Sequence, residues 1–336
     1  MTFTMTRRKA LGFGGTLAGG ALLGTGLAVA DALNSTEPAD KIANTYAKVT
    51  EAAGGTWSSM ISLNEGDAVR EVVLAEPDRV VEAYSVNKIP VAVAVLDKID
   101  RGELTLDQRV EVTEDIVVDD TDGIFGLDGA YPSSVTLGHT LATMLTVSDN
   151  TCVRLCGLVC PARELNEILR SKGFEHTQVD PVENPNRFFL GKTTPRETHT
   201  LLQKLVAGEL LSEESTTYLL TVLRSLTAFT DGFRLRLTSP ERLRVATKAG
   251  WFADGRNEAG VVFSQDGVPQ ATYALFASGT FTGGEAVDED FGATHPAVQA
   301  RAELGRVVLD AVAAVPTQRT SANRYPAPEY RPSNGG

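Results

Sequence analysis

Strand-forming sequence occurs in two blocks near the ends of the chain, and a long helical stretch separates them. In the first block, residues 57–63 and 69–75 alternate apolar and polar side chains, as paired strands do. The second block, at residues 243–247, 259–264 and 272–278, is rich in strand-forming residues. Strands must pair to satisfy their backbone groups, so we expect the two blocks to share one sheet, with the helical middle inserted as a second lobe.

Helical periodicity fills the middle of the chain and marks its two ends. Residues 85–101 repeat apolar side chains at spacings of three and four, which predicts a buried helix. The other predicted helices are 41–53, 136–147, 151–159, 163–172, 195–207, 213–226 and 296–314.

This order of elements predicts an α/β (α+β) domain at residues 41–316, in which an antiparallel sheet is flanked by terminal helices. Residues 41–83 and 235–316 form its α/β lobe, and residues 84–234 form an inserted all-helical lobe. A cleft between two lobes is a common place for a binding site.

The N-terminus has the pattern of an export signal. A basic start at Arg7-Arg8 precedes a mild apolar run that ends near Ala30, and the arginine pair indicates the twin-arginine route. We expect residues 1–30 to be a signal peptide and residues 31–40 a linker, so that the protein reaches the periplasm, the cell envelope or the medium. The alternative is a retained anchor helix, for which the glycines of the run are unfavourable.

The C-terminal residues 317–336 are rich in proline, asparagine and glycine, which predicts a disordered tail. The chain carries a net charge of −12 at pH 7. An acidic surface repels nucleic acid and anionic lipid, so we exclude those partners. We expect a monomer with a small-molecule substrate and no stable membrane span.

The cysteines Cys152, Cys156 and Cys160 recur at a spacing of four on a predicted helix. Cβ atoms at this spacing lie about 5–6 Å apart, whereas a disulfide needs about 3.8 Å. We expect buried, free thiols rather than a metal or redox site, because no C-x-x-C pair is present. The histidines also lack a zinc-binding spacing and no G-x-S-x-G elbow occurs, so we expect neither metal nor cofactor. The histidines are His139, His176, His199 and His295.

A serine and a lysine lie three residues apart at the start of the buried helix, in Ser85-Val86-Asn87-Lys88. A serine hydroxyl is a weak nucleophile until a base takes its proton. A lysine at this spacing shares the helix face, and burial lowers the pKa of a lysine so that it can accept a proton. The alternative is an ordinary capped helix with an exposed lysine.

Two further tripeptides carry polar groups at the ends of predicted elements. Ser148-Asp149-Asn150 lies between two helices, where it is alternatively a turn with an N-cap. Lys248-Ala249-Gly250, followed by Trp251, ends a predicted strand. Lysine there can present charge to a ligand, and glycine allows close backbone approach. The alternative is an exposed strand-end lysine.

In this order the three motifs resemble the S-x-x-K, S-D-N and K-T-G set of class A β-lactamases and penicillin-binding proteins, over about residues 43–314. The resemblance implies that Ser85 attacks the substrate carbonyl and that Lys88 holds or relays its proton. Ser148 would relay a proton to the departing nitrogen, and Asn150 would orient Lys88 and the substrate.

The resemblance assigns the remaining roles to the strand end and to a long loop. Lys248 would attract the substrate carboxylate, Gly250 would let the backbone approach, and the backbone N–H groups of Ser85 and Trp251 would form the oxyanion hole. Residues 175–194 read as a long irregular loop. Within it, Val179 to Glu183 resembles the stretch that ends in the family's deacylating glutamate, so Glu183 is the candidate base; its alternative is a solvated loop acid.

Departures from the family pattern concern the substrate carboxylate. Ala249 replaces the threonine of K-T-G, and Glu258 lies where many class A enzymes carry an arginine, so we expect Glu258 to repel a carboxylate. Arg234 or Arg236 would supply the charge instead. Trp251 is bulky where the family has small residues, and we expect it to narrow the cleft.

The sequence therefore predicts a secreted serine β-lactamase that hydrolyses a β-lactam amide through an acyl-enzyme on Ser85. One alternative is a penicillin-recognising serine hydrolase or peptidase acting on a cell-wall peptide or another ester or amide, which the changes at Ala249 and Glu258 favour. The other is a non-catalytic secreted binding protein on the same fold, against which the intact polar motifs argue.

Overall fold

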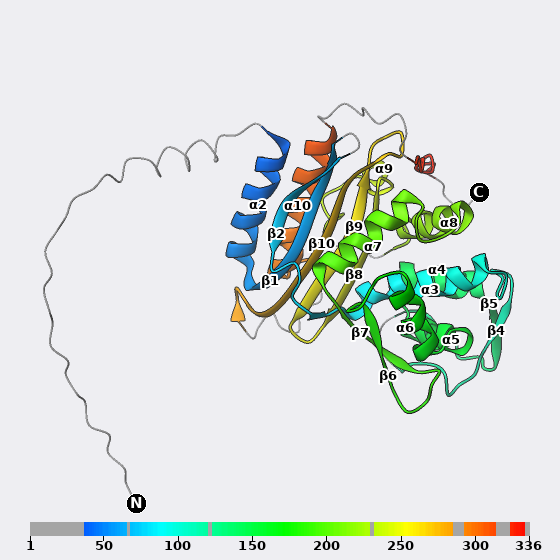
Figure 1. Ribbon diagram of the computed structural model, residues 1–336. Helices are drawn as coiled ribbons and strands as arrows, with labels where there is room; N and C mark the ends of the chain where they lie inside the picture. The colour runs from blue at the N-terminus through cyan, green and yellow to red at the C-terminus, as the bar shows by residue number, and fades with distance from the viewer. Residues whose placement is uncertain are drawn as a thin grey trace, which may run out of the picture. The chain divides into compact units, whose positions relative to one another are not determined.

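The central feature of the fold is a five-stranded antiparallel sheet with the strand order β2-β1-β10-β9-β8 (Figure 1). The computed structural model describes residues 37–65, 68–119, 123–228, 232–284, 292–313 and 323–332. The predicted signal peptide, residues 1–30, lies outside the described residues. The strands of the sheet are β1 (Gly54–Glu65), β2 (Ala68–Ala75), β8 (Val245–Phe252), β9 (Gly255–Phe263) and β10 (Pro269–Phe281).

The two strand blocks of the sequence meet where β1 pairs with β10, with Ile61 opposite Tyr273. The predicted antiparallel sheet is confirmed. Strand β8 continues to Phe252, five residues beyond the predicted strand end at Thr247. The motif Lys248 to Gly250 therefore lies within a strand, because β8 and β9 pair up to the turn that joins Phe252 to Gly255.

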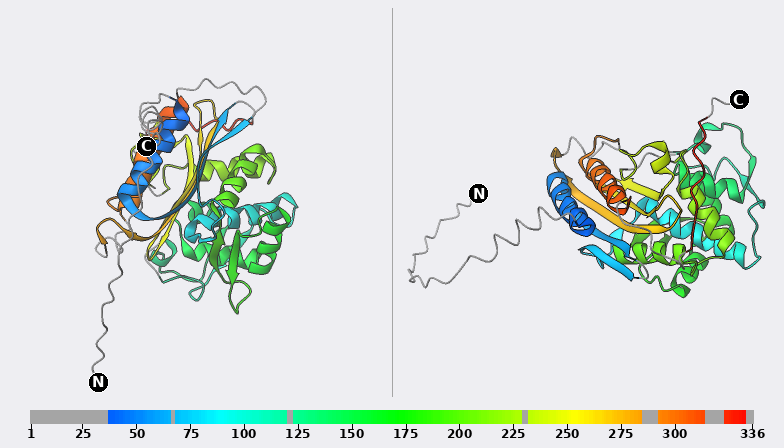
Figure 2. Two further views of the ribbon diagram at one scale, coloured as in Figure 1. Left: turned by 60° about the vertical axis from the view of Figure 1, so that its left-hand side comes forward. Right: turned by 90° about the horizontal axis from the view of Figure 1, so that it is seen from above.

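Two terminal helices, α2 (Pro38–Ala53) and α10 (Pro296–Ala313), lie side by side on one face of the sheet (Figure 2). Their apolar residues, such as Ile42 and Val308, pack with sheet residues including Val262. Helix α2 begins three residues before the predicted start at 41, since Glu37 caps its first turn and proline is favoured there.

The helical lobe packs against the opposite face of the sheet (Figure 2). Its helices are α3 (Lys88–Asp100), α4 (Leu137–Thr146), α5 (Asn150–Val159), α6 (Ala162–Ser171), α7 (Pro195–Ala207) and α8 (Glu213–Leu223), and the short α9 (Ser239–Arg242) leads back to the sheet. Helix α3 is apolar on all sides and is the core of this lobe; its residues from Val91 to Leu96 are fully buried. The predicted fold, an α/β lobe with a helical insertion, is thus confirmed.

Short strands supplement the helical lobe. They are β3 (Val81–Glu82), β4 (Arg109–Val112), β5 (Ser133–Thr136), β6 (Gln178–Pro181) and β7 (Phe188–Thr193), and two 3₁₀ turns, η1 (Tyr84–Asn87) and η2 (Phe125–Leu127), complete the elements. The prediction of an irregular loop at 175–194 is wrong, because β6 and β7 form a hairpin whose second strand pairs with β3. Its tip comprises residues 182–187.

The predicted disorder of the tail is wrong for residues 323–332, which dock onto the domain (Figure 2). Tyr325 is buried, its backbone N donates to the carbonyl O of Gly267, and its hydroxyl donates to that of Val206. Arg224 donates to the carbonyl O of Tyr325 and lies over the ring of Phe263. The sequence pattern missed this because one buried aromatic side chain anchors an otherwise polar segment.

The three cysteines are free and buried, as predicted. Burial raises the pKa of each thiol, for Cys160 to about 12, so the thiols stay protonated and unreactive. Within the described ranges, no helix combines the length and apolarity that crossing a bilayer would need.

Candidate active site

The predicted nucleophile lies in a tight turn between the two lobes. Ser85 is the second residue of η1, which runs directly into α3, and its side chain is half-buried. Tyr84 has a φ of 49°, in the left-handed region that residues with a Cβ seldom adopt. Over the described part of the chain, the hydroxyl of Ser85 makes no hydrogen bond to another protein group.

The ammonium of Lys88 joins the first motif to the second. The side chain is fully buried, and Nζ donates to Oγ of Ser148 at 2.9 Å and to Oδ1 of Asn150 at 2.8 Å. It also donates to the carbonyl O of Ser148. The structure therefore brings Lys88 together with two other predicted residues, Ser148 and Asn150, which lie 60 and 62 positions after it in the chain. The predicted exposed alternative for Lys88 is wrong.

Asp149, the middle residue of the second motif, fixes this arrangement. Its Oδ1 caps α5 by accepting from the backbone N of Cys152, as the N-cap interpretation predicted. Its Oδ2 accepts from the backbone N of Ile124 at 2.7 Å and of Phe125 at 2.9 Å. Ser148 has a φ of 59° between α4 and α5, and these bonds hold the strained turn in place.

The end of β8 presents the third motif to the nucleophile turn. Lys248 is buried and lies on the face of the sheet that meets the helical lobe, opposite Ala259. A Cβ at Gly250 would lie 2.7 Å from the backbone N of Ser85, so only glycine lets the strand come this close. Trp251, one residue further, is half-buried.

Glu258 does not act as predicted. It is fully buried and forms an ion pair with Arg301 of α10 at 2.9 Å. It also accepts from the hydroxyl of Thr247 and the backbone N of Phe233. Its register partner is Ala249, and this face of β9 turns toward α10. The prediction that Glu258 repels a substrate carboxylate is therefore wrong, because strand alternation directs it away from Lys248.

Of the two arginines predicted to supply charge, Arg236 is exposed and donates to Gln299 of α10, on the far face of the sheet. Arg234 is buried and donates to the carbonyl O of Ser225, the second residue after α8. Arg234 thus remains a candidate for the carboxylate, and Arg236 does not.

Glu183 is exposed at the tip of the β6–β7 hairpin. This tip lies against α5 and α6, where the backbone N of Ala162 donates to the carbonyl O of Pro185 and Gly157 closely approaches Asn186. The structure gives Glu183 no contact with the Lys88 cluster in the described residues. Its assignment as the deacylating base stays a prediction.

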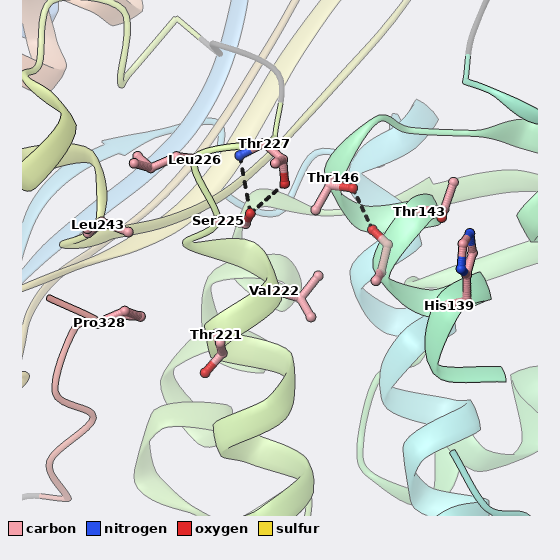
Figure 3. A pocket seen from close by; sticks show the side chains of 11 residues that line it. His139, Thr143, Thr146, Thr221, Val222, Ser225, Leu226, Thr227, Leu243 and Pro328 are labelled. Atoms are coloured by element: carbon pink, nitrogen blue, oxygen red, sulfur yellow. Dashed lines mark hydrogen bonds between the residues drawn. The ribbon is translucent and has the colours of Figure 1, made fainter. Parts of the chain in front are cut away.

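Two cavities lie near these elements. A cavity of about 240 Å³ borders the nucleophile turn, and Tyr84, Glu82 and Asn257 are among its lining residues. A larger one of about 450 Å³ lies between α4 and α8, and none of the predicted site residues lines it (Figure 3). Partial burial, with the nearby carboxylates of Asp254 and Glu82, raises the pKa of Tyr84, so its phenol stays protonated at neutral pH.

Among the described residues, no cluster of three or more histidine, cysteine or acidic side chains has the arrangement of a metal site. A buried lysine bridging a serine and an asparagine, beside a half-buried serine, can move protons to and from that serine. Lys248 adds a positive charge on the neighbouring strand. The arrangement therefore suits acyl transfer to Ser85.

Comparison with known proteins gives a matching family model and a distant relative. A family model described as the beta-lactamase enzyme family matches residues 38–312. Beta-lactamase VEB-1 of Pseudomonas aeruginosa is 26% identical over 197 residues, which cover 54% of this chain and 65% of the relative, so the match spans slightly less than two thirds of that relative's length.

Solved structures share the fold. A beta-lactamase from Xanthomonas campestris pv. campestris has a TM-score of 0.68 at 20% identity, over 83% of this chain and all of the other. A beta-lactamase from Sphaerobacter thermophilus has a TM-score of 0.67 at 22% identity, over 81% of this chain and 98% of the other.

Proposed function

The chain belongs to the beta-lactamase enzyme family, and on that premise we propose that it hydrolyses β-lactam amides through an acyl-enzyme on Ser85. The observation that carries the proposal is the buried hydrogen-bonded cluster of Lys88, Ser148 and Asn150 beside that serine. A binding module has no need of a fully buried lysine whose ammonium bridges two motifs, because burying a charge is costly and hydrogen bonds offset only part of the cost.

Acylation uses these groups in turn. The Lys88 ammonium, which donates three hydrogen bonds in the structure, first loses a proton to solvent. The neutral amine then takes the hydroxyl proton of Ser85 as Oγ bonds to the carbonyl carbon. Backbone N–H groups of Ser85 and Trp251 hold the oxyanion. The C–N bond then breaks, Ser148 gives its proton to the departing nitrogen, and Lys88 returns a proton to Ser148, so that charge and protons balance.

Substrate recognition in this proposal depends on buried cations. Lys248 lies on the face of β8 that meets the helical lobe and attracts the substrate carboxylate, with Arg234 as the second candidate. Ala249 lacks the threonine hydroxyl of the family motif. Loss of one charge-assisted hydrogen bond costs about 1.5–3 kcal/mol, so we expect weaker binding of carboxylate-bearing substrates rather than none.

Deacylation requires a base that activates water, and we assign it to Glu183. Since this carboxylate is exposed at a hairpin tip in the described structure, that role requires the tip to approach Ser85 after acylation.

The exposed position of Glu183 favours a second candidate function, a serine hydrolase or peptidase acting on a cell-wall peptide or another ester or amide. Without a carboxylate beside the acyl group, an acyl-enzyme formed from a β-lactam persists. Such a protein would be acylated by penicillin and released from it slowly.

Intact-protein mass spectrometry after exposure to penicillin separates these functions. A transient adduct with turnover supports the β-lactamase, and an adduct that lasts for hours supports the peptidase. Absence of both adduct and turnover, with penicillins, cephalosporins and simple esters alike, contradicts both and leaves the binding protein. Ser85→Ala must abolish the adduct in either of the first two cases.

Export through the twin-arginine route is also a proposal. Its support is the Arg7-Arg8 pair followed by a mild apolar run. Replacing both arginines by lysine should leave the protein inside the cell, whereas continued export would contradict this route.

A further inference from the structure

We propose that Asn257 is a positioning residue that holds the backbone before Ser85 in the conformation required for acylation; the inference rests on the role proposed for Ser85. Asn257 belongs to none of the three motifs and comes from β9, the neighbour of the strand that carries Lys248.

The register of the sheet directs Asn257 at the nucleophile turn. Asn257 lies directly opposite Gly250, so the two residues share a face of the sheet. On that face, Gly250 comes so close to the backbone N of Ser85 that an added Cβ would lie 2.7 Å from it. The Asn257 amide reaches the preceding residues, where Nδ2 donates to the carbonyl O of Glu82 at 2.9 Å and lies 3.5 Å from that of Ala83.

The other end of the amide is also fixed. Oδ1 accepts from the backbone N of Ala277 on β10 at 3.2 Å. The pairing of β9 with β10 ends at Glu258 and Leu275, so this side chain takes over where the ladder stops. Asn257 is 3% exposed. Bonded at both ends and shielded from water, the amide has little freedom to rotate.

The segment that Asn257 contacts, residues 82–85, contains a strained backbone conformation. Tyr84, between Ala83 and Ser85, is in a left-handed conformation, and such a conformation persists only where its surroundings impose it. The cavity of about 240 Å³ along Glu82 and Tyr84 leaves fewer packing contacts to impose that conformation. Restraint therefore depends on hydrogen bonds. These include the bonds of Asn257, the bond from the backbone N of Ala83 to Gly191 on β7, and the pairing of Glu82 with Lys192.

The test compares Asn257→Asp with a matched variant, Asn64→Asp. The aspartate at 257 keeps the acceptor for Ala277 but turns an oxygen toward the carbonyl of Glu82, in place of the donor. Asn64 is a buried asparagine of β1, 7% exposed, whose Nδ2 donates to the carbonyl O of Pro269 at 3.0 Å, at the start of β10. It makes the same kind of bond without contacting the nucleophile turn.

Two readouts are taken on the full chain: the rate of acylation by penicillin, and hydrogen exchange of a peptide covering residues 82–87. A misplacement of about 1 Å costs a reaction roughly 100-fold. We expect Asn257→Asp to slow acylation about 100-fold and to speed exchange in 82–87, while Asn64→Asp lowers the melting temperature with neither effect. Equal slowing in both variants, or unchanged exchange in 82–87, would overturn the inference.

If Asn257→Asp does not fold, Asn257→Ser removes the donor arm without adding charge and serves in its place. If the wild-type protein neither forms an adduct with penicillin nor hydrolyses it, the proposed function fails. Hydrogen exchange then decides the role of Asn257 by itself, since faster exchange in 82–87 supports it and unchanged exchange contradicts it.

Discussion

Nζ of Lys88 lies 2.9 Å from Oγ of Ser148, and this contact joins the first residue of α3 to the turn between α4 and α5. Neither residue is exposed to solvent. Protons can pass between the two groups without bulk water, which is the transfer that the proposed acylation requires.

The first prediction concerns that contact. Ser148→Ala removes the hydroxyl that returns a proton to the leaving nitrogen, and we expect acylation by penicillin to slow by about 10²–10⁴-fold. Thr146→Ala is the matched control, because among the described residues its hydroxyl bonds to the carbonyl O of Ala142 in the same helix. The adduct measured by mass against time gives both rates; equal rates for the two variants would remove Ser148 from the mechanism.

Glu183→Gln tests the deacylating base. If Glu183 activates water, the variant should be acylated at the wild-type rate and should retain the adduct at least 100-fold longer. Asp180→Asn, which removes another exposed acid of the same hairpin, should behave as wild type. Unchanged adduct lifetime in Glu183→Gln would identify Glu183 as a solvated acid and support the peptidase.

The buried ion pair of Glu258 and Arg301 should be costly to break from one side. Arg301→Met leaves a carboxylate buried without its cation, and we expect a loss of about 3–5 kcal/mol in the free energy of unfolding. The double variant Glu258→Gln with Arg301→Met should recover most of the loss. Urea unfolding measures both, and a loss below 1 kcal/mol in Arg301→Met would contradict the pairing.

Acid should destabilise the protein through His199. Burial, with a smaller contribution from Arg196, lowers the pKa of His199 to about 4. Its ring bonds Ser62 at 2.8 Å. In the unfolded chain the pKa is about 6.5, so the unfolded state binds the proton first as the pH falls.

The stability that neutral His199 contributes is therefore complete above pH 6.5 and is lost between pH 6.5 and 4, by about 3 kcal/mol. Unfolding in urea across this range should show a shallower pH dependence in His199→Gln, which does not titrate. Identical slopes for wild type and variant would contradict the low pKa.

The docked tail should stabilise the domain. Tyr325 is 6% exposed, and Tyr325→Ala should cost roughly 3–5 kcal/mol, as for other buried aromatic residues. Tyr330→Ala is the control, since Tyr330 lies in the same segment with 43% of its surface exposed. A melting temperature equally unchanged in both variants would show that the segment does not dock in solution.

Local pattern was sufficient to predict most of the fold. The apolar repeat of residues 85–101 marked the helix that became the core of the helical lobe, and alternation marked the strands, because burial of one face imposes the period of the element. The order of strands and helices then left few arrangements of the sheet.

Pattern failed where a contact between distant residues decides the local structure. The β6–β7 hairpin was missed because its second strand is stabilised by pairing with β3, far away in sequence. Docking of the tail depends on Tyr325 meeting Arg224 and Phe263, which no local period reveals.

For the site, the sequence by itself determined which side chains are available: a serine and lysine one helical turn apart, a second serine with asparagine, and a lysine beside glycine. Only the tertiary structure decided which of them meet. Lys88 contacts Ser148 because two helices pack, and Glu258 turns away from Lys248 toward Arg301 because strand register fixes its face. Register and packing are properties of the assembled sheet and helices, so no stretch of sequence contains them.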